Sequence, residues 1–316
     1  MSGNREESPM TWMHVLVRVG LNAVTHPVEY VKVLIQIGHE PMEPYKSRTI
    51  FGREKMFYPS VFSYIAHIKK RDGLIGCYRG LTPKLMSNVV SGLTFQRVVE
   101  NIKFPELDDP CQKPEDLTTH QKTQVFIQNT LRETAGRIAA ITASQPFHVI
   151  AIRCMAEFVG EDGKYTGIIS SITVIYKEEG IKGYFSGLVP RLLCDIGALW
   201  LANSFIHIIN NFVVEDKDIK SYIAASMRFM ASAIMYPLQV VANCMAATGS
   251  GLVGCSPPLM PLYDNWYDCY KHLRQIKGLK RGSSLLWRTY TGPQIMLDGG
   301  VSLPSQSMFR NPSKKL

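Results

Sequence analysis

Charged side chains occur inside several long apolar stretches of this chain of 316 residues. Asp195 is the clearest case, because the stretch from Ile196 to Val214 contains no Asp, Glu, Lys or Arg. A buried carboxylate without a partner is unfavourable, so Asp195 should pair with an arginine or face water. Ionisable groups in such stretches often line the path of a polar molecule through a membrane. The chemistry predicted here is electrostatic, with Asp195 as its first candidate residue.

Three arginines share one position relative to a proline. Arg18, Arg137 and Arg228 each lie nine residues before a proline within an apolar segment. If these segments are related by a pseudo-threefold axis, the arginines lie at one depth in the membrane. An arginine near a helix end can also reach a lipid phosphate, so both interpretations stay open. The residues predicted to line an intramembrane groove are Arg18, Asn88, Arg97, Arg137, Asp195, Asn203 and Arg228.

The sequence does not indicate bond-making chemistry. Its seven cysteines lack CxxC or Cys/His spacing, which predicts free thiols in a reducing compartment and no bound metal. No nucleophile with a nearby base and no phosphate-binding loop emerges, so we expect neither an enzyme nor a cofactor. The net charge of +9 suits anionic partners. Because Lys and Arg are scattered and no nucleic-acid-binding motif occurs, we expect membrane lipids and no nucleic acid.

A pattern of turn residues and charges recurs along the chain. The stretch "RDGLIGCYRGLTPKL" has a counterpart in "EEGIKGYFSGLVPRL" about a hundred residues later. Each of three windows also runs fifteen positions from a tyrosine to a glycine and carries apolar residues at helical spacing, which predicts three short amphipathic helices. These windows are 58–73, 165–180 and 263–278. The sequence therefore contains three tandem repeats.

Long apolar segments flank these windows. Each window is preceded by a segment with an interior proline, which predicts a kinked helix of the kind that membranes tolerate. The first two windows are followed by further apolar segments from Pro83 and from Pro190, and crossing a bilayer takes about 20 helical residues. No comparable segment follows Trp287-Arg288, so we expect five spans and no sixth. Arginines inside three of the segments keep a soluble helical repeat open as the alternative.

The first repeat carries a recognisable signature. Pro27, Glu29 and Lys32, followed by Asp72-Gly73 and Tyr78-Arg79-Gly80, resemble the mitochondrial carrier signature. That resemblance implies an all-α membrane protein with a threefold pseudo-repeat of kinked helices, surface helices and straight helices. The predicted organisation is a first repeat at residues 1–104, a polar loop insert at 105–130, a second repeat at 131–214 and a degenerate third repeat at 215–316.

The later repeats depart from this signature. His148 and Ala151 replace the acid and the base after Pro146, and both charges after Pro237 are also lost. In the carriers that the chain resembles, these charges form a ring of ion pairs between repeats that gates transport. With only Glu29 and Lys32 left, no such ring can close, so gated exchange lacks its switch. The residual motif consists of Pro27, Glu29, Lys32, Pro146, His148 and Pro237.

The missing span and the lost gates predict a polar groove that opens sideways to lipid. Such a groove lowers the free energy of moving the polar flank of a helix through hydrocarbon. The stretches "VKVLIQIGHEPMEP" and "GLVPRLLCDIGALWLANS" also resemble the mitochondrial carrier homologue family. This resemblance implies an outer-membrane insertase for tail-anchored and other α-helical proteins, and docking of a BH3-type apoptotic protein. The alternatives are a divergent solute carrier of the inner membrane and a scaffold or receptor that binds partners through the polar insert.

Overall fold

The computed structural model describes residues 9–48, 52, 54–102, 119–160, 162–212, 217–257, 259–290, 295–297 and 300–302. Within these ranges, the side chains of residues 9–16, 18, 119, 120, 122, 210–212, 217–220, 295–297 and 300–302 are not described.

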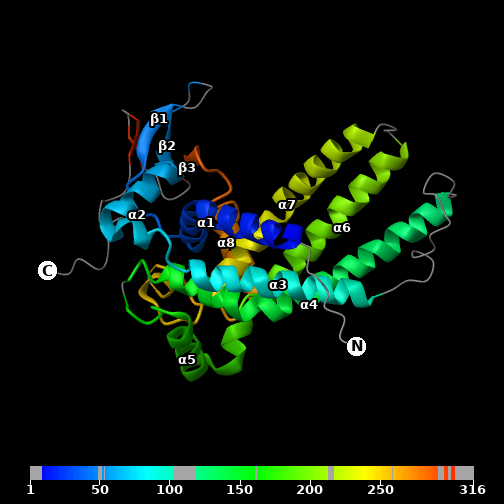
Figure 1. The fold of residues 1–316 in the computed structure, drawn as a ribbon. Helices are drawn as coiled ribbons and strands as arrows, with labels where there is room; N and C mark the ends of the chain where they lie inside the picture. Colours follow the sequence, from blue (N-terminus) through cyan, green and yellow to red (C-terminus); the bar gives the residue numbers. More distant parts are fainter. Residues whose placement is uncertain are drawn as a thin grey trace.

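Five long helices make up the main body (Figure 1). They are α1 (Pro9–Ile37), α3 (Leu81–Asn101), α4 (Thr119–Ala156), α6 (Leu188–Phe212) and α7 (Lys217–Ala247). The sequence prediction of proline-containing helices is confirmed, because Pro27, Pro146 and Pro237 lie inside α1, α4 and α7. Residues 119–130 belong to α4, which corrects the second half of the loop predicted at 105–130; the segment 103–118 lies outside the described residues.

Three short helices follow the kinked helices at the predicted places. They are α2 (Val61–Gly76), α5 (Ile168–Glu179) and α8 (Trp266–Gln275), and each begins three residues after the tyrosine of its repeat. The side chain of Ser60 caps α2 by accepting a hydrogen bond from the backbone N–H of Ser63 at 3.3 Å. Two 3-10 turns, η1 (Gly180–Phe185) and η2 (Val253–Cys255), complete the loops.

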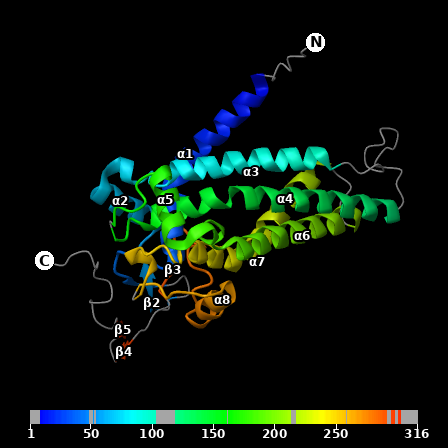
Figure 2. The same cartoon turned by 90° about the horizontal axis from the view of Figure 1, so that it is seen from below.

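The long helices form a curved wall. Contacts run from α3 to α4, from α4 to α6 and from α6 to α7, while α1 touches α3, α4 and α7. Figure 2 shows the N-terminal part of α1 pointing away from this wall. Three described segments, 123–156, 168–209 and 221–247, are long and apolar enough to cross a membrane. The all-α membrane class is thus supported, while crossing by α1 and α3 stays a prediction.

The main core lies where the C-terminal parts of α1, α4 and α7 meet the loops that follow them, and we call this region the closed end. Tyr30, Leu34, Ile150 and Phe158 are fully buried there. Full burial of one such side chain stabilises a protein by about 1.5–3 kcal/mol. The larger of the two buried hydrophobic clusters among the described residues therefore lies at the closed end.

A buried arginine joins the second and third repeats at the closed end. Arg153 on α4 is fully buried and forms an ion pair with Glu179 at the end of α5. Its Nε also donates to the backbone oxygen of Ala246 on α7 at 3.0 Å, and its Nη1 donates to the hydroxyl of Tyr165 at 3.4 Å. Because a buried guanidinium needs compensation on all sides, this set of contacts fixes α4 against α7.

A small antiparallel sheet joins the first repeat to the last, which the sequence analysis did not predict. Its order is β1 (Tyr45–Arg48), β2 (Glu54–Tyr58) and β3 (Arg288–Thr289), with Tyr58 paired to Arg288. Arg288 also forms an ion pair with Glu40. A separate hairpin contains β4 (Ile295–Leu297) and β5 (Gly300–Ser302). Among the described residues after Gln275 there are only turns and short strands, in line with the predicted lack of a sixth span.

Candidate functional site

Each repeat packs a glycine against the kinked helix of the next repeat. Gly80, Gly187 and Gly282 have φ values of 79°, 73° and 71°, a region that favours glycine. A Cβ at these positions would lie 2.9, 2.5 and 3.3 Å from the backbone oxygens of Ala151, Ala242 and Lys32. All three oxygens belong to the fifth residue after the helix proline, where carriers place the basic residue of their ring. Backbone packing therefore closes the circle of three repeats at this level.

This glycine circle corrects the predicted register of the third repeat. The sequence analysis places the third aromatic-basic pair at Trp287-Arg288 by analogy with Tyr78-Arg79. In the structure Arg281-Gly282 packs where Arg79-Gly80 packs in the first repeat, and Trp287-Arg288 leads into the sheet. The third loop is thus shorter than its counterparts up to the glycine. Spacing alone could not show this, because the sequence around Gly282 has lost the aromatic residue of the motif.

The residue before each helix proline makes an equivalent hydrogen bond in all three repeats. His26 Nε2 lies 3.1 Å from the backbone oxygen of Arg79, and Gln145 Nε2 donates to that of Ser186 at 2.8 Å. In the third repeat the hydroxyl of Tyr236 donates to the backbone oxygen of Arg281 at 2.6 Å. Three different side chains therefore hold the loop before each glycine. The signal available in the sequence was a polar residue before every one of these prolines.

The residual motif charges make contacts unlike an acid-base ring between repeats. Glu29 pairs with Lys84 at the start of α3, inside its own repeat. The ammonium group of Lys32 lies 5.0 Å from the ring centre of Tyr236 on α7, a cation–π contact. His148 is half-buried on α4, and its imidazole ring lies in the electrostatic field of Arg191 and Lys84. Pro27, Pro146 and Pro237 serve as the interior helix prolines described above.

A polar cavity of about 310 Å³ lies between α3, α4 and α6. Three of the predicted groove residues, Asn88, Arg137 and Asp195, line it together. The other lining residues are Ser91, Gly92, Phe95, Ala140, Ile141 and Arg191. Asn88 and Arg137 are exposed, so the cavity communicates with the surface. Arg191 is the main residue that the sequence analysis missed, although its place directly after Pro190 was visible.

The charges in this cavity are held by neighbouring helices. The Nη1 of Arg191 donates to Oε1 of Gln145 on α4 at 2.7 Å. Gln145 is itself 1% exposed and bonded to the loop at Ser186, so the guanidinium has a fixed position. Asp195, one helical turn further along α6, is half-buried, and its carboxylate interacts electrostatically with both Arg191 and Arg137. Asp195 thus has two arginines in its surroundings, while the predicted ion pair with one of them stays a prediction.

The remaining predicted groove residues do not line this cavity. Arg97 and Arg228 are exposed on α3 and α7, respectively. Asn203 lies in the contact between α6 and α4, where its Nδ2 donates to Oε2 of Glu133 at 3.1 Å. The side chain of Arg18 lies outside the described residues. Of the two arginines whose side chains are described, Arg137 lines the cavity and Arg228 does not, while the placement of Arg18 stays a prediction.

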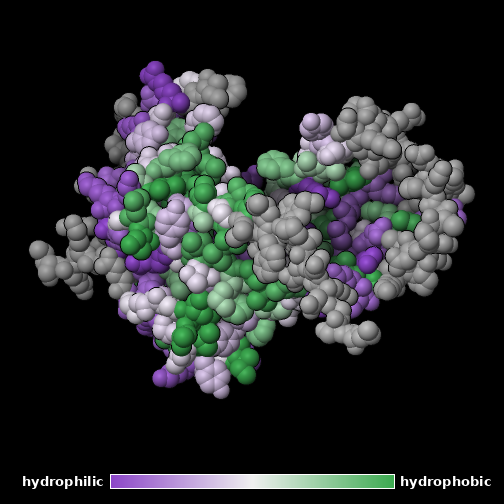
Figure 3. Space-filling model, viewed as in Figure 1, coloured by the Kyte–Doolittle hydropathy of each residue, from purple (hydrophilic) through white to green (hydrophobic). Residues whose placement is uncertain are grey.

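Hydrophilic residues gather on the concave side of the wall. Figure 3 shows a hollow between the α6–α7 side and the α3–α4 side, in which hydrophilic residues lie among some hydrophobic ones. The helix that could cover this side, α1, exposes Leu21 and Val24 by 60% and 76%. Among the described residues, no helix follows α8, so none occupies the place of a sixth helix of a complete ring.

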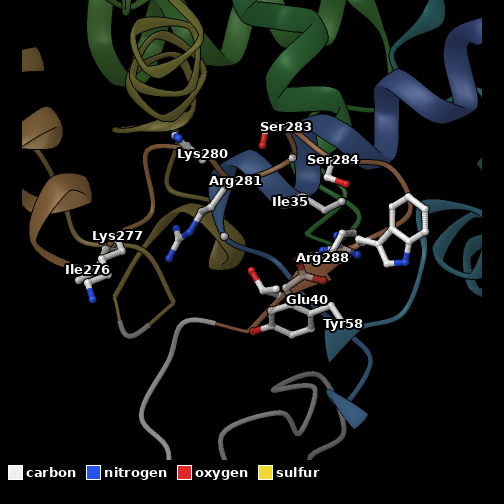
Figure 4. Close-up of a pocket in the computed structure, with 14 residues that line it drawn as sticks. Ile35, Glu40, Tyr58, Ile276, Lys277, Lys280, Arg281, Ser283, Ser284 and Arg288 are labelled. Atoms are coloured by element: carbon white, nitrogen blue, oxygen red, sulfur yellow. Dashed lines mark hydrogen bonds and ion pairs between the residues drawn. The ribbon is translucent and has the colours of Figure 1, made fainter. Parts of the chain in front are cut away.

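A second cavity, of about 590 Å³, lies outside the helical wall at the closed end. Figure 4 shows Glu40 beside Arg288 and Tyr58 at its floor, while Lys280 and Arg281 come from the segment after α8. Burial lowers the pKa of Arg288 to about 10. The cavity therefore joins the sheet, the end of α1 and the third repeat around basic side chains.

Comparison with known proteins identifies the family to which this chain belongs. A family model described as mitochondrial carrier protein matches residues 16–104 and 123–217. The chain belongs to the mitochondrial carrier family. It is similar to human mitochondrial carrier homolog 2, with 42% identity over 283 residues that cover 87% of this chain and 92% of that protein. It is 36% identical to mouse mitochondrial carrier homolog 1 over 309 residues, or 90% and 79% of the two chains.

More distant carriers also match. Mitochondrial uncoupling protein 3 of Arabidopsis thaliana is 25% identical over 280 residues, which cover 85% of this chain and 81% of that protein. The identities mark this chain as a divergent carrier homologue and a mitochondrial membrane protein. The family model matches the first two repeats and ends at residue 217, where the third repeat begins to lose its motif.

Proposed function

We propose that this divergent carrier homologue inserts tail-anchored and other α-helical proteins into the outer mitochondrial membrane. The observation that carries the proposal is the cavity between α3, α4 and α6, in which Asn88, Arg137, Arg191 and Asp195 meet and which communicates with the surface. A polar segment that crosses hydrocarbon without partners pays several kcal/mol for each unsatisfied group. Side chains that offer hydrogen bonds and both signs of charge at membrane depth lower that barrier. The client helix can then leave sideways into lipid.

The contacts at the closed end favour insertion over gated exchange. Alternating access requires contacts that form in one state and break in the other. Here the circle of Gly80, Gly187 and Gly282 is made by backbone atoms, and Glu29 is already paired with Lys84 within one repeat. Neither contact supplies a switch between repeats. A protein that stays in one conformation and offers a polar surface fits this arrangement.

Reconstitution tests the proposal directly. The purified protein in phosphatidylcholine liposomes should protect the tail of an added tail-anchored client from protease well above the level of empty liposomes. Asp195→Arg should lower the yield severalfold, because three arginines would then repel one another without a carboxylate. Asp264→Arg reverses a charge at an exposed site outside the cavity and is the matched control. Protection equal to that of empty liposomes would reject the insertase function.

The membrane assignment has its own test. We propose the outer membrane, as the resemblance to the mitochondrial carrier homologue family implies. Protease added to intact mitochondria should cleave the chain between α3 and α4, or else at the segments that join α1 to α3 and α4 to α6. Inner-membrane proteins should stay protected. Full protection until the outer membrane is ruptured would instead favour the inner membrane and a carrier function.

A solute carrier is the second candidate, because a cavity of about 310 Å³ is large enough for a small metabolite. Uptake of a labelled anionic solute into proteoliposomes, lost in Arg191→Ala, would favour it over insertion. The receptor hypothesis, including recognition of a BH3-type protein, depends on the polar insert, most of which lies outside the described residues. Deletion of residues 105–118 with insertion unchanged but partner recruitment lost would support it.

A further inference from the structure

The second cavity, which we call the outer cavity, has an excess of positive charge. Lys277, Lys280, Arg281 and Arg288 line it together with one carboxylate, that of Glu40. Glu40 is already paired with Arg288. Among the described residues, no acid forms an ion pair with either of the two lysines or with Arg281. The described lining residues therefore leave three positive charges without a partner.

This excess arises because the third repeat has lost an acid. The residue before the glycine that ends each repeat window is Asp72 in the first repeat and Glu179 in the second. Both acids form ion pairs with arginines, and Asp72 does so with Arg79 at 3.3 Å. The third repeat has Lys277 at this position. Arg281, which packs where Arg79 packs in the first repeat, is therefore left without an equivalent carboxylate.

Lys277 also has an unusual backbone conformation. Among the described residues other than glycine, it alone has a positive φ, of 54°. In the first two repeats the positive φ falls on Gly73 and Gly180, at 74° and 68°. Glycine is the usual residue in this conformation at the end of a helix, so a lysine there costs stability. Strain of this kind concentrates at functional sites, which indicates that the lysine side chain has a use there.

The outer cavity also offers a hydrogen-bond acceptor and aromatic rings. Oε2 of Glu40 is buried and has no hydrogen-bond partner among the described residues. Figure 4 shows Glu40, Arg281 and Tyr58 facing one space. Trp287 lines the same cavity and is 72% exposed, so its ring is accessible for stacking. The volume of about 590 Å³ lies in the range of small-molecule sites.

We infer that the outer cavity binds a water-soluble diphosphate ester whose organic part is a flat ring with a hydroxyl or N–H donor, as in a nucleoside diphosphate. A terminal phosphate carries about −1.5 to −2 charges at pH 7, so two phosphate groups balance the excess. Lys277, Lys280 and Arg281 donate charge-assisted hydrogen bonds to them. Oε2 of Glu40 accepts one from the organic part. This site does not depend on the proposed insertase function.

A soluble ligand fits the location better than a lipid. The lining residues of the outer cavity lie outside the three described segments that are apolar enough to cross a membrane, 123–156, 168–209 and 221–247. Two of the basic residues, Lys277 and Lys280, are exposed. Their attraction for an anion should therefore weaken as salt is added.

Calorimetric titration of the full chain in detergent, without magnesium, tests the ligand class. Adenosine diphosphate should bind about tenfold more tightly than adenosine monophosphate, which has one phosphate group fewer. It should also bind about tenfold more tightly than pyrophosphate, which lacks the ring and the donor for Glu40. Wild-type protein that binds no adenosine diphosphate, or binds the three ligands equally, would overturn the inference.

Lys277→Gly separates a binding role from a structural one. The affinity for adenosine diphosphate should fall about tenfold. The melting temperature without ligand should rise by about 2 °C, because glycine accepts a positive φ. Arg281→Gln should weaken binding to a similar extent. Lys271→Gln, which removes an exposed charge from α8 outside the cavity, should leave the affinity unchanged. Unchanged affinity in both Lys277→Gly and Arg281→Gln would overturn the inference.

Two further controls identify the site and the source of the phosphate. If Arg191→Gln abolishes binding of adenosine diphosphate while Lys277→Gly does not, the ligand occupies the cavity between α3, α4 and α6, and the inference is wrong. The same titration is made with phosphatidylglycerol in lipid nanodiscs. Lipid binding that Lys277→Gly weakens, without any binding of adenosine diphosphate, would assign the outer cavity to a lipid headgroup and would also overturn the inference.

Discussion

The closed end and the polar cavity are built from the same repeats but follow opposite rules. At the closed end, three equivalent positions make one contact three times, through glycines that pack on backbone oxygens of the next repeat. In the cavity, equivalent positions have diverged, so that Asn88 stands where Asp195 stands and Lys84 where Arg191 stands. The threefold symmetry of the scaffold is thus kept where it supports the fold. It is lost in the cavity that we propose to receive a client.

The largest effect should come from the buried ion pair of the closed end. Glu179→Ala leaves the guanidinium of Arg153 buried without its carboxylate, which should destabilise the protein by about 3–5 kcal/mol. Thermal unfolding in detergent measures this loss. Glu178→Ala, next to it in sequence but paired with Lys164 in an exposed ion pair, should cost less than about 1 kcal/mol. Similar losses for both variants would contradict the packing described here.

The glycine circle allows a sharper version of that test. In Gly187→Ala the new Cβ would lie 2.5 Å from the oxygen of Ala242 at a positive φ, so we expect a loss of about 3 kcal/mol. Gly163→Ala shares the positive φ, at 67°, but nothing lies within 4 Å of its Cβ. Its loss should be about 1 kcal/mol, from backbone strain alone. Equal melting temperatures for the two variants would show that the circle of repeats is not tightly packed.

Acid should weaken the closed end through His39. Burial, with Arg71 and His67 nearby, lowers the pKa of His39 from 6.5 to about 4. Between these values the unfolded chain binds more protons than the folded protein, so stability falls as the pH is lowered. The loss should be about 2 kcal/mol from pH 6.5 to pH 5. His39→Leu should flatten this dependence, as melting curves at several pH values can measure; an unchanged slope would assign it to another group.

The smallest effect on stability is expected in the cavity. Asn88→Leu replaces an exposed polar side chain, so the free energy of unfolding should change by less than about 1 kcal/mol. Insertion of a tail-anchored client should nevertheless fall about threefold to tenfold, because a hydrogen-bonding partner at membrane depth is lost. Met86→Leu changes an exposed apolar residue on the same helix and is the control. A loss of stability without a loss of insertion would reverse the comparison between the two regions.

The sequence predicts the scaffold better than the site. Helical spacing and interior prolines locate the long helices, and each short helix begins three residues after the tyrosine of its repeat. Local pattern suffices there because helices are defined by near neighbours. The sheet was missed because β2 and β3 are separated by most of the chain and each is short. No local signal marks a pairing of that kind.

The site shows a different limit. Distance from a proline gives the depth of a residue along a helix but not the direction in which its side chain points. Arg137 and Arg228 share that distance, yet only Arg137 lines the cavity. Arg191 was overlooked because its place in the repeat motif already explained its presence. The hydrogen bond from Arg191 to the amide of Gln145 joins α6 to α4, so it can be recognised only once the two helices are placed side by side.

The pairing of β2 with β3 has a consequence for biosynthesis. The backbone N–H of Val61 donates to the oxygen of Leu285 at 3.0 Å, and Tyr290 donates back to Met56 at 2.9 Å. The sheet that contains β1 and β2 therefore cannot be completed until residues 285–290 have been synthesised. Contacts between such distant parts of a chain form slowly. During synthesis, the edge of β2 that pairs with β3 stays without that partner until β3 has been made.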